Sequence, residues 1–447
     1  MESFANLNEY KYHTDEQNKI GTDNLTRINN NANIELREKI ENLFKSENSE
    51  SLRIESINSI KNHKFSNSFE EISQIEDSNV LNLLVDLIHD NNEHISQSAF
   101  NAVIQIASIS EDYALLIFER GICPICRKLI SQREKLIDVL ALLNNISSYG
   151  GVFSRRAYQI LPFNSISGLI SEISNLSLLA RYILNTMKSF RTDKFFMKQA
   201  FSFLFDIIQK KDIDSTCLIL CILRKMAKDE QLTGFKQNIN EISGFVIKQV
   251  KNGISCSKVI YQSLLFIGYM VKKRLIDGID FDLFKIILNY HKSSDIQVIK
   301  ACLWCVNEFV INKSVVVDSN FLSDFLVKNQ SVITLSPYEI KREYCLFIVT
   351  TILQLPTESD LHNLSSKINL NDVLTAFIDT DDTEIVKSLL DVLQRWLESE
   401  KRNNPKIDLK THISEDLYHF IEDIANKDDN ITNYTSLSLL DMINDVK

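Results

Sequence analysis

Two pairs of cysteines have a spacing that could bind a metal or carry out redox chemistry. They are Cys123-Pro-Ile-Cys126 and Cys302-Leu-Trp-Cys305, and the thiolates of a C-x-x-C pair can hold zinc or exchange a disulfide. A structural zinc ion needs four converging ligands, and no histidine lies close to either pair in the sequence. We therefore expect both pairs to be structural thiols and the protein to hold no metal.

Nothing else in the sequence has the pattern of a catalytic or nucleotide-binding site. The eight histidines are scattered, and none joins a serine or cysteine in a recognisable nucleophile motif. Neither the G-x-x-x-x-G-K-[ST] nor the G-x-G-x-x-G loop occurs, so no phosphate-binding loop is indicated. We therefore expect a protein that is not an enzyme and that carries no cofactor.

The composition favours helices over strands. The chain of 447 residues is 44% hydrophobic, yet it holds only ten glycines and five prolines, and all-β folds need many tight turns. The formal net charge is −10, and an acidic protein is a poor general binder of nucleic acid. This acidity suits basic peptides or proteins as partners, or it serves only solubility, and the composition leaves both interpretations open.

The cysteines and the absence of long apolar runs indicate a reducing compartment. Most of the eight cysteines lie within apolar helical stretches, as buried free thiols do. The first 33 residues are polar, unlike a signal peptide, and no run of about 18 apolar residues suggests a membrane span. We expect a protein of the cytoplasm and nucleus with no membrane association.

Apolar residues recur at helical spacing from Ile34 onward. Residues 1–33 are polar and irregular, and we expect them to be disordered. Further along, Leu81 to Ile88 and His94 to Ser108 each carry an apolar stripe, and the polar segment Asp90 to Glu93 separates them. Two such helices form a hairpin that cannot bury its apolar faces alone, so a neighbouring unit must stack on it.

This helical unit recurs with a regular period. Comparable points in the longer helices are, in order, Gln105, Asn145, Asn185, Ile222, Tyr269, Asn307 and Thr350. The six steps cover 350 − 105 = 245 residues, or about 41 each, close to the roughly 40–47 residues of armadillo and HEAT repeats. We predict an all-α, right-handed solenoid of about ten armadillo repeats over residues 34–447.

Several segments share a residue pattern with one known family. The clearest are Lys341-Arg-Glu-Tyr-Cys-Leu-Phe-Ile-Val-Thr-Thr351, Ser263-Leu-Leu-Phe-Ile-Gly-Tyr-Met-Val271 and Asp382-Thr-Glu-Ile-Val386. They resemble K-K-E-A-C-W-T-I-S-N-I, A-L-R-A-V-G-N-I-V and D-T-K-I-V of the importin alpha family. Weaker similarities of the same kind lie at Ile34 to Arg37, Ser98 to Ser108 and His419 to Asp445. The resemblance covers nearly the whole chain in the family's order.

The resemblance implies a peptide-binding groove. In this family the third helix of each repeat lines a concave groove, where an Asn amide binds the backbone of an extended peptide and Trp rings hold Lys or Arg stems. The residues at the family's Asn positions are Gln105, Asn145, Asn185 and Asn307. We expect these four to bind the backbone of a basic localisation peptide, best around Asn145 and Asn185.

The positions that carry Trp in the family differ here. They hold Asn101, Ala141, Arg181, Leu303 and Leu346. Arg181 places a positive charge where the family seats a cargo lysine, and like charges repel. Trp304 is one residue away from the expected position, which rotates it by about 100° on a helix, so we expect it in the core. The family's usual grip on a basic peptide is therefore weakened.

The N-terminal segment also departs from the family, whose importin-beta-binding segment is densely basic. Residues 1–50 contain six Lys or Arg and ten Asp or Glu, a balance of 6 − 10 = −4. A segment of this sign is not expected to dock on an acidic receptor by charge. We interpret the region up to about residue 50 as a degenerate importin-beta-binding region that binds weakly or has lost that role.

The resemblance implies a nuclear import adaptor. Its partners would be importin beta and cargo proteins with basic localisation signals, and we expect a monomer that binds no nucleic acid. The alternative is an armadillo or HEAT scaffold that organises a protein complex and performs no transport. The loss of the Trp positions and of the basic N-terminus favours the scaffold, and the family-like order of the segments favours the adaptor.

Overall fold

The computed structural model describes most of the chain after residue 37. The described residues are 38–45, 49–63, 65, 72, 75–166, 175–190, 192–228, 232–253, 256–276, 279–380, 382–427 and 432–444. The predicted disordered segment, residues 1–33, and the predicted helix start near Ile34 lie outside them. Helix is present over residues 38–44, and the regular structure of all described residues is helical, with no strand.

Contacts within the chain divide it into two units, Met1–Leu169 and Ile170–Lys447. The helices described in the first unit are α2 (Glu50–Asn62), α4 (Val80–Leu87), α5 (Glu93–Ile106), α6 (Glu111–Glu119), α7 (Ile122–Ile130), η1 (Arg133–Lys135), α8 (Leu136–Ser147), α9 (Gly151–Ile160) and α10 (Phe163–Ile166). The predicted hairpin corresponds to α4 and α5. It is confirmed, because the two helices pack together and Asn92, in the predicted polar break, accepts a hydrogen bond from Ile95 N and so caps α5.

The first unit has two layers of helices. α2 packs on α5, and α5 packs on α8, so these three form a continuous row. α6 packs against α4 and α7, and α7 packs against α9. Side chains such as Phe100, Val103 and Leu143 are fully buried between the layers, which is how repeats that are unstable alone stabilise one another.

The second unit continues the same arrangement over a longer stretch. Its described helices are α11 (Leu176–Phe190), α12 (Lys194–Gln209), α13 (Ile213–Lys228), η3 (Thr233–Phe235), α14 (Lys236–Lys251), α15 (Ser257–Lys272), α16 (Phe281–Leu288), η4 (Asn289–Lys292), α17 (Ile296–Ile311), α18 (Ser319–Leu335), α19 (Tyr338–Leu353), α20 (Glu358–Lys367), α21 (Leu370–Thr375), α22 (Thr383–Asn403), α23 (Leu409–His412), α24 (Glu415–Ala425) and α25 (Thr432–Asn444). Acidic N-caps such as Asp280, Asp295, Asp318 and Asp382 begin several of them.

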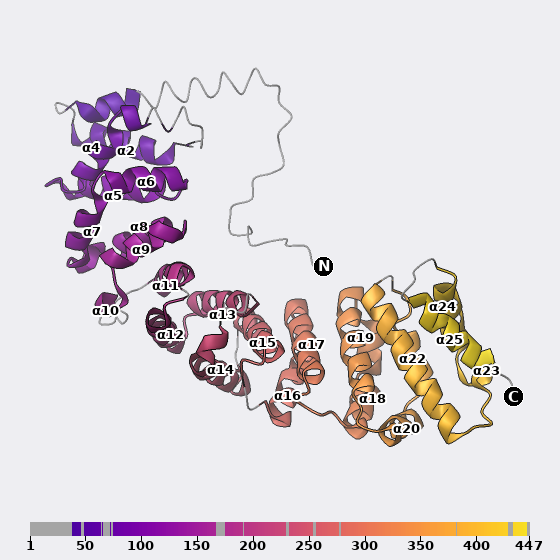
Figure 1. Ribbon diagram of the computed structural model, residues 1–447. Helices are drawn as coiled ribbons and strands as arrows, with labels where there is room; N and C mark the ends of the chain where they lie inside the picture. The colour runs from indigo at the N-terminus through magenta and orange to yellow at the C-terminus, as the bar shows by residue number, and fades with distance from the viewer. Residues whose placement is uncertain are drawn as a thin grey trace, which may run out of the picture. The chain divides into compact units, whose positions relative to one another are not determined.

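Seven of the helices described in the second unit form one row, which can be followed in Figure 1. α11, α13, α15, α17, α19, α22 and α25 contact one another in this order. We call them, together with α2, α5 and α8 of the first unit, the ladder helices. α12, α14 and α16 form a second row, and α18 packs on α20. We call these five the cover helices.

The predicted repeat is confirmed by where its reference positions lie. The seven comparable residues from Gln105 to Thr350 lie on α5, α8, α11, α13, α15, α17 and α19, one on each successive ladder helix. The all-α solenoid predicted from the sequence is therefore observed. Within the described residues, no helix is both long and apolar enough to cross a membrane.

Candidate functional site

Two of the four predicted amides lie close together in the first unit. Asn145, on α8, is half-buried, and its Nδ2 donates a hydrogen bond to the carbonyl oxygen of Ile104 on α5, 2.9 Å away. Gln105 follows Ile104 on α5, and its side chain is exposed. The structure therefore brings Gln105 and Asn145 together, although the Asn145 donor already links the two helices.

The other two predicted amides are on α11 and α17 of the second unit, with α13 and α15 between them. Asn185 is half-buried, and its Oδ1 accepts a hydrogen bond from Lys188 Nζ at 3.3 Å. Asn307 is only 7% exposed, and its Oδ1 has no hydrogen-bond partner within the described residues. Asn145 and Asn185 belong to different units, so their pairing, like peptide binding by all four amides, stays a prediction.

Trp304 is half-buried, whereas the sequence placed it in the core. Its ring lies against Gly268 of α15, because a Cβ at position 268 would come within 2.4 Å of Trp304 Cζ3. The ring centroids of Trp304 and Tyr269 are 4.9 Å apart. The missing side chain of Gly268 thus provides the space for the indole, which pairs with a second half-buried ring.

One cation, Arg224, lies against this aromatic pair, and two more, Lys188 and Lys225, lie near enough to Arg224 or to each other to interact electrostatically. The Arg224 guanidinium lies 5.6 Å from the ring centroid of Tyr269, which is within the range of a cation–π interaction. Neighbouring residues partly desolvate the Lys188 and Lys225 ammonium groups and lower the pKa of both, and the charges of Arg224 and Lys188 add to the effect at Lys225. We call Lys188, Arg224, Lys225, Tyr269 and Trp304 the cation–aromatic face.

The charge of the surrounding ladder helices differs in sign from that of the whole chain. α11, α13 and α15 together contain seven Lys or Arg and one Asp, a balance of 7 − 1 = +6 in a chain of net charge −10. That aspartate, Asp214, accepts a hydrogen bond from Lys258 at 2.9 Å. Lys272 and Lys300 are also paired, with Glu308 and Glu339. Within the described residues, Lys188 on α11 and Arg224 and Lys225 on α13 form no ion pair with a carboxylate.

The cysteine pairs are embedded in the helical packing. Burial raises the pKa of Cys126 to about 12, and it also raises the pKa of Cys302 and Cys305. The Cys302 thiol donates a hydrogen bond to the carbonyl oxygen of Ile287 at 3.0 Å, whereas Cys123 is only half-buried. Thiols held protonated in this way are poor nucleophiles and metal ligands. Among the described residues, no group of three or more His, Cys, Asp or Glu is placed to hold a metal ion.

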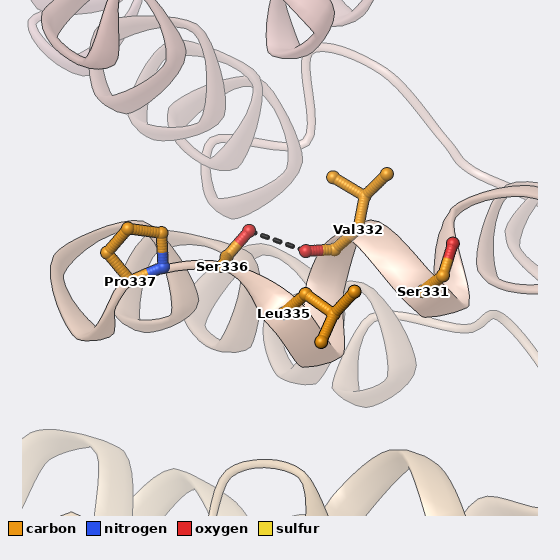
Figure 2. A pocket seen from close by; sticks show the side chains of 5 residues that line it. All are labelled: Ser331, Val332, Leu335, Ser336 and Pro337. Atoms are coloured by element: carbon orange, nitrogen blue, oxygen red, sulfur yellow. Dashed lines mark hydrogen bonds between the residues drawn. The ribbon is translucent and has the colours of Figure 1, made fainter.

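A shallow recess at the junction of α18 and α19 is formed by small and apolar side chains (Figure 2). It is lined by Ser331, Val332, Leu335, Ser336 and Pro337. The Ser336 hydroxyl donates a hydrogen bond to the carbonyl oxygen of Val332 at 2.6 Å, and Leu335 is 83% exposed. The lining offers no acid, base or activated nucleophile, so it does not form a catalytic site.

Comparison with known proteins identifies the fold. The sequence matches no family model, and no curated protein matches it. An engineered protein is similar with a TM-score of 0.61 and 15% identity, over 91% of this chain and 98% of that one. A structure from a study of the phosphorylation switch that controls the cadherin and beta-catenin interaction has a TM-score of 0.53 and 11% identity, over 92% and 83%. A designed armadillo repeat protein in complex with the peptide (KR)4 is similar only in part, with a TM-score of 0.35 and 13% identity over 62% and 99%.

Beta-catenin is built of armadillo repeats, and the likeness to its complex spans nearly all of this chain. This chain has the armadillo-repeat fold. At these identities the likeness concerns the fold alone, and the importin alpha resemblance rests on the sequence segments. The armadillo ladder contains a group of residues that the sequence analysis missed, namely Lys188, Arg224 and Lys225. The excess of basic residues in three consecutive ladder segments could have indicated them. It was missed because the comparison with the family considered only the Asn and Trp positions.

Proposed function

We propose that this protein is a non-enzymatic scaffold that holds an extended segment of a partner protein across its ladder helices. The supporting observation is a repeated pair of half-buried side chains, one turn apart, on ladder helices. These pairs are Leu218 and Ile222 on α13, Leu265 and Tyr269 on α15, and Leu346 and Thr350 on α19. An extended chain that crosses α13 and α15 can contact one such pair after the other, as in other solenoid proteins, whereas α17 buries the corresponding Leu303 and Asn307.

Selection from a displayed library of random peptides tests this proposal. Selected peptides should bind the full chain, and Leu265→Glu on α15 should weaken their binding, because the charge would lie under the bound chain. Val327→Glu on the cover helix α18, at a side chain 65% exposed, is the matched control and should leave binding unchanged. The absence of any selected peptide, or equal loss in both variants, would contradict the proposal.

A nuclear import adaptor is a second candidate, and the importin alpha resemblance favours it. The segments that carry this resemblance lie on α5, α15 and α19 and at the start of α22. In this role the protein would act in the cytoplasm and nucleus and bind importin beta and cargo with basic localisation signals. A pull-down with importin beta and with a basic localisation peptide tests this role. If the protein fails to retain importin beta or fails to retain the peptide, the adaptor role is excluded and the scaffold proposal stands.

A further inference from the structure

The cation–aromatic face has charged groups that the fold itself does not use. Lys188 Nζ has an amide oxygen, that of Asn185, as its hydrogen-bond partner, and Arg224 contacts Cys221 Sγ at 3.9 Å and the Tyr269 ring. No carboxylate pairs with Lys188, Arg224 or Lys225 within the described residues. Three neighbouring cations repel one another, so an anionic ligand would relieve a repulsion that the folded protein carries alone.

Remote acidic residues do not cancel this local charge. At physiological ionic strength the Debye length is about 8 Å, so acidic residues that lie well beyond that distance are largely screened from the face. Asp214, the one acidic residue of α11, α13 and α15, is bound by Lys258. Glu308 on α17 is buried and is bound by Lys272, whose ammonium lies 5.9 Å from the centroid of the Trp304 ring. A ligand at the face therefore meets the positive charge of α11 and α13 rather than the charge of the whole protein.

The aromatic part of the face supplies a different kind of contact. Tyr269 and Trp304 are both half-buried and lie side by side on α15 and α17. Exposed aromatic surface beside arginine is typical of the residues that dominate protein–protein interfaces. The ligand should therefore carry acidic groups at one end and an apolar side chain at the other.

We infer that the cation–aromatic face binds an extended acidic peptide segment of a partner protein, with carboxylates at Lys188, Arg224 and Lys225 and an apolar side chain on Tyr269 and Trp304. This inference rests on the proposed scaffold function and names the ligand of that site. Adjacent helices are about 9 Å apart and an extended chain rises about 3.3 Å per residue. The three steps from α11 to α17 thus require about nine residues.

Titration of the full chain with matched peptides tests the inference. The probes are blocked peptides of about nine residues with Asp and Glu in the first half and Leu and Phe in the second, and versions with Gln or Lys in place of the acids. The acidic peptide should bind best, and its affinity should fall as salt increases. The double variant Lys188→Glu with Lys225→Glu should bind it at least about tenfold more weakly and should gain affinity for the Lys peptide.

Lys198→Glu with Lys248→Glu is the matched control. Both lysines are exposed on the cover helices α12 and α14, so this pair changes the net charge equally and should leave the acidic peptide's affinity within about twofold. Circular dichroism checks that both double variants are folded. The variant Lys188→Glu with Lys225→Glu, which we call the ladder reversal, places new carboxylates near Arg224, where they should not destabilise the fold.

The outcomes separate the inference from the proposed function. If the Gln or Lys peptide binds as tightly as the acidic one and Leu265→Glu abolishes that binding, the scaffold function stands and the acidic ligand is wrong. If none of the peptides binds and the library yields none, both proposals fail. Tighter binding of a single-stranded oligonucleotide, lost in the ladder reversal, would reassign the face to nucleic acid and overturn the inference.

Discussion

At the scale of single residues, Asn145 contributes to the packing of the ladder as well as being a candidate ligand group. Its Nδ2 binds the Ile104 carbonyl near the C-terminal end of α5, where helix carbonyls lack partners within the helix. Tyr149 acts in the same way, because its hydroxyl donates to the Ala107 carbonyl at 3.3 Å. An amide at this position can therefore be selected for packing, without any peptide.

Replacing Asn145 by Ala should lower the free energy of unfolding by about 1 kcal/mol, because the Ile104 carbonyl loses its donor. Gln105→Ala, next to that carbonyl but exposed, should change it by less than about 0.5 kcal/mol. Urea unfolding of the two variants and the wild type measures both values. Equal stability of the two variants would mean that the Asn145 hydrogen bond does not contribute.

Gly268 and Trp304 provide a second test at the residue scale. Gly268→Ala would push a methyl group against the indole, so we expect a loss of about 1–3 kcal/mol and altered Trp304 fluorescence. Gly244, in α14, has no atom within 4 Å of an added Cβ, so Gly244→Ala should be neutral or stabilising by up to about 1 kcal/mol. If Gly268→Ala behaves like this control, the indole is not seated as described.

At the scale of helices, the segments that resemble importin alpha also hold neighbouring repeats together. Arg342 Nε on α19 donates to Asp382 Oδ2 at 2.7 Å, and Asp382 Oδ1 accepts from Glu384 N at 3.0 Å at the start of α22. One aspartate thus caps a helix and bonds the preceding ladder helix. Such residues can be kept for stability alone, so the resemblance is stronger support for the fold than for a cargo.

His291, in η4, contacts the ladder helix α19 through a group whose protonation depends on pH. Its Nδ1 lies 2.9 Å from the Tyr344 hydroxyl on α19, and burial, with a smaller contribution from Lys292, lowers the pKa of His291 to about 4. The unfolded chain takes up this proton near pH 6.5, so it binds more protons than the folded chain between about pH 6.5 and 4. Stability should therefore fall as the pH decreases through this window.

The expected loss from His291 is about 3 kcal/mol over the window, added to the losses from other groups. His291→Asn keeps a polar group opposite Tyr344 but cannot take up a proton. Unfolding free energies of both proteins at several pH values between 7 and 4 give the difference. If the unfolding free energy of the wild type changes with pH no more steeply than that of the variant, the fold does not hold His291 neutral.

At the scale of the whole molecule, the sequence determined the repeat but not the exposure of the site residues. Helical period and polar breaks are local properties, so α4, α5 and the register from Gln105 to Thr350 could be predicted. Exposure depends on the neighbouring helix. Asn307 is buried, and Trp304 is half-buried with its indole against Gly268 of another helix. The regular step of 185 − 145 = 40 residues also gave no sign that the chain divides into two units near residue 170.

The measurement that tests the central claim most directly is hydrogen exchange of the full chain with and without a saturating bound peptide, from the library or the designed acidic set. A ligand that crosses the ladder helices should slow exchange in α11, α13, α15 and α17 together and leave the cover helices α12, α14 and α16 unchanged. Protection confined to the cover helices, or to the recess at the end of α18, would contradict the account.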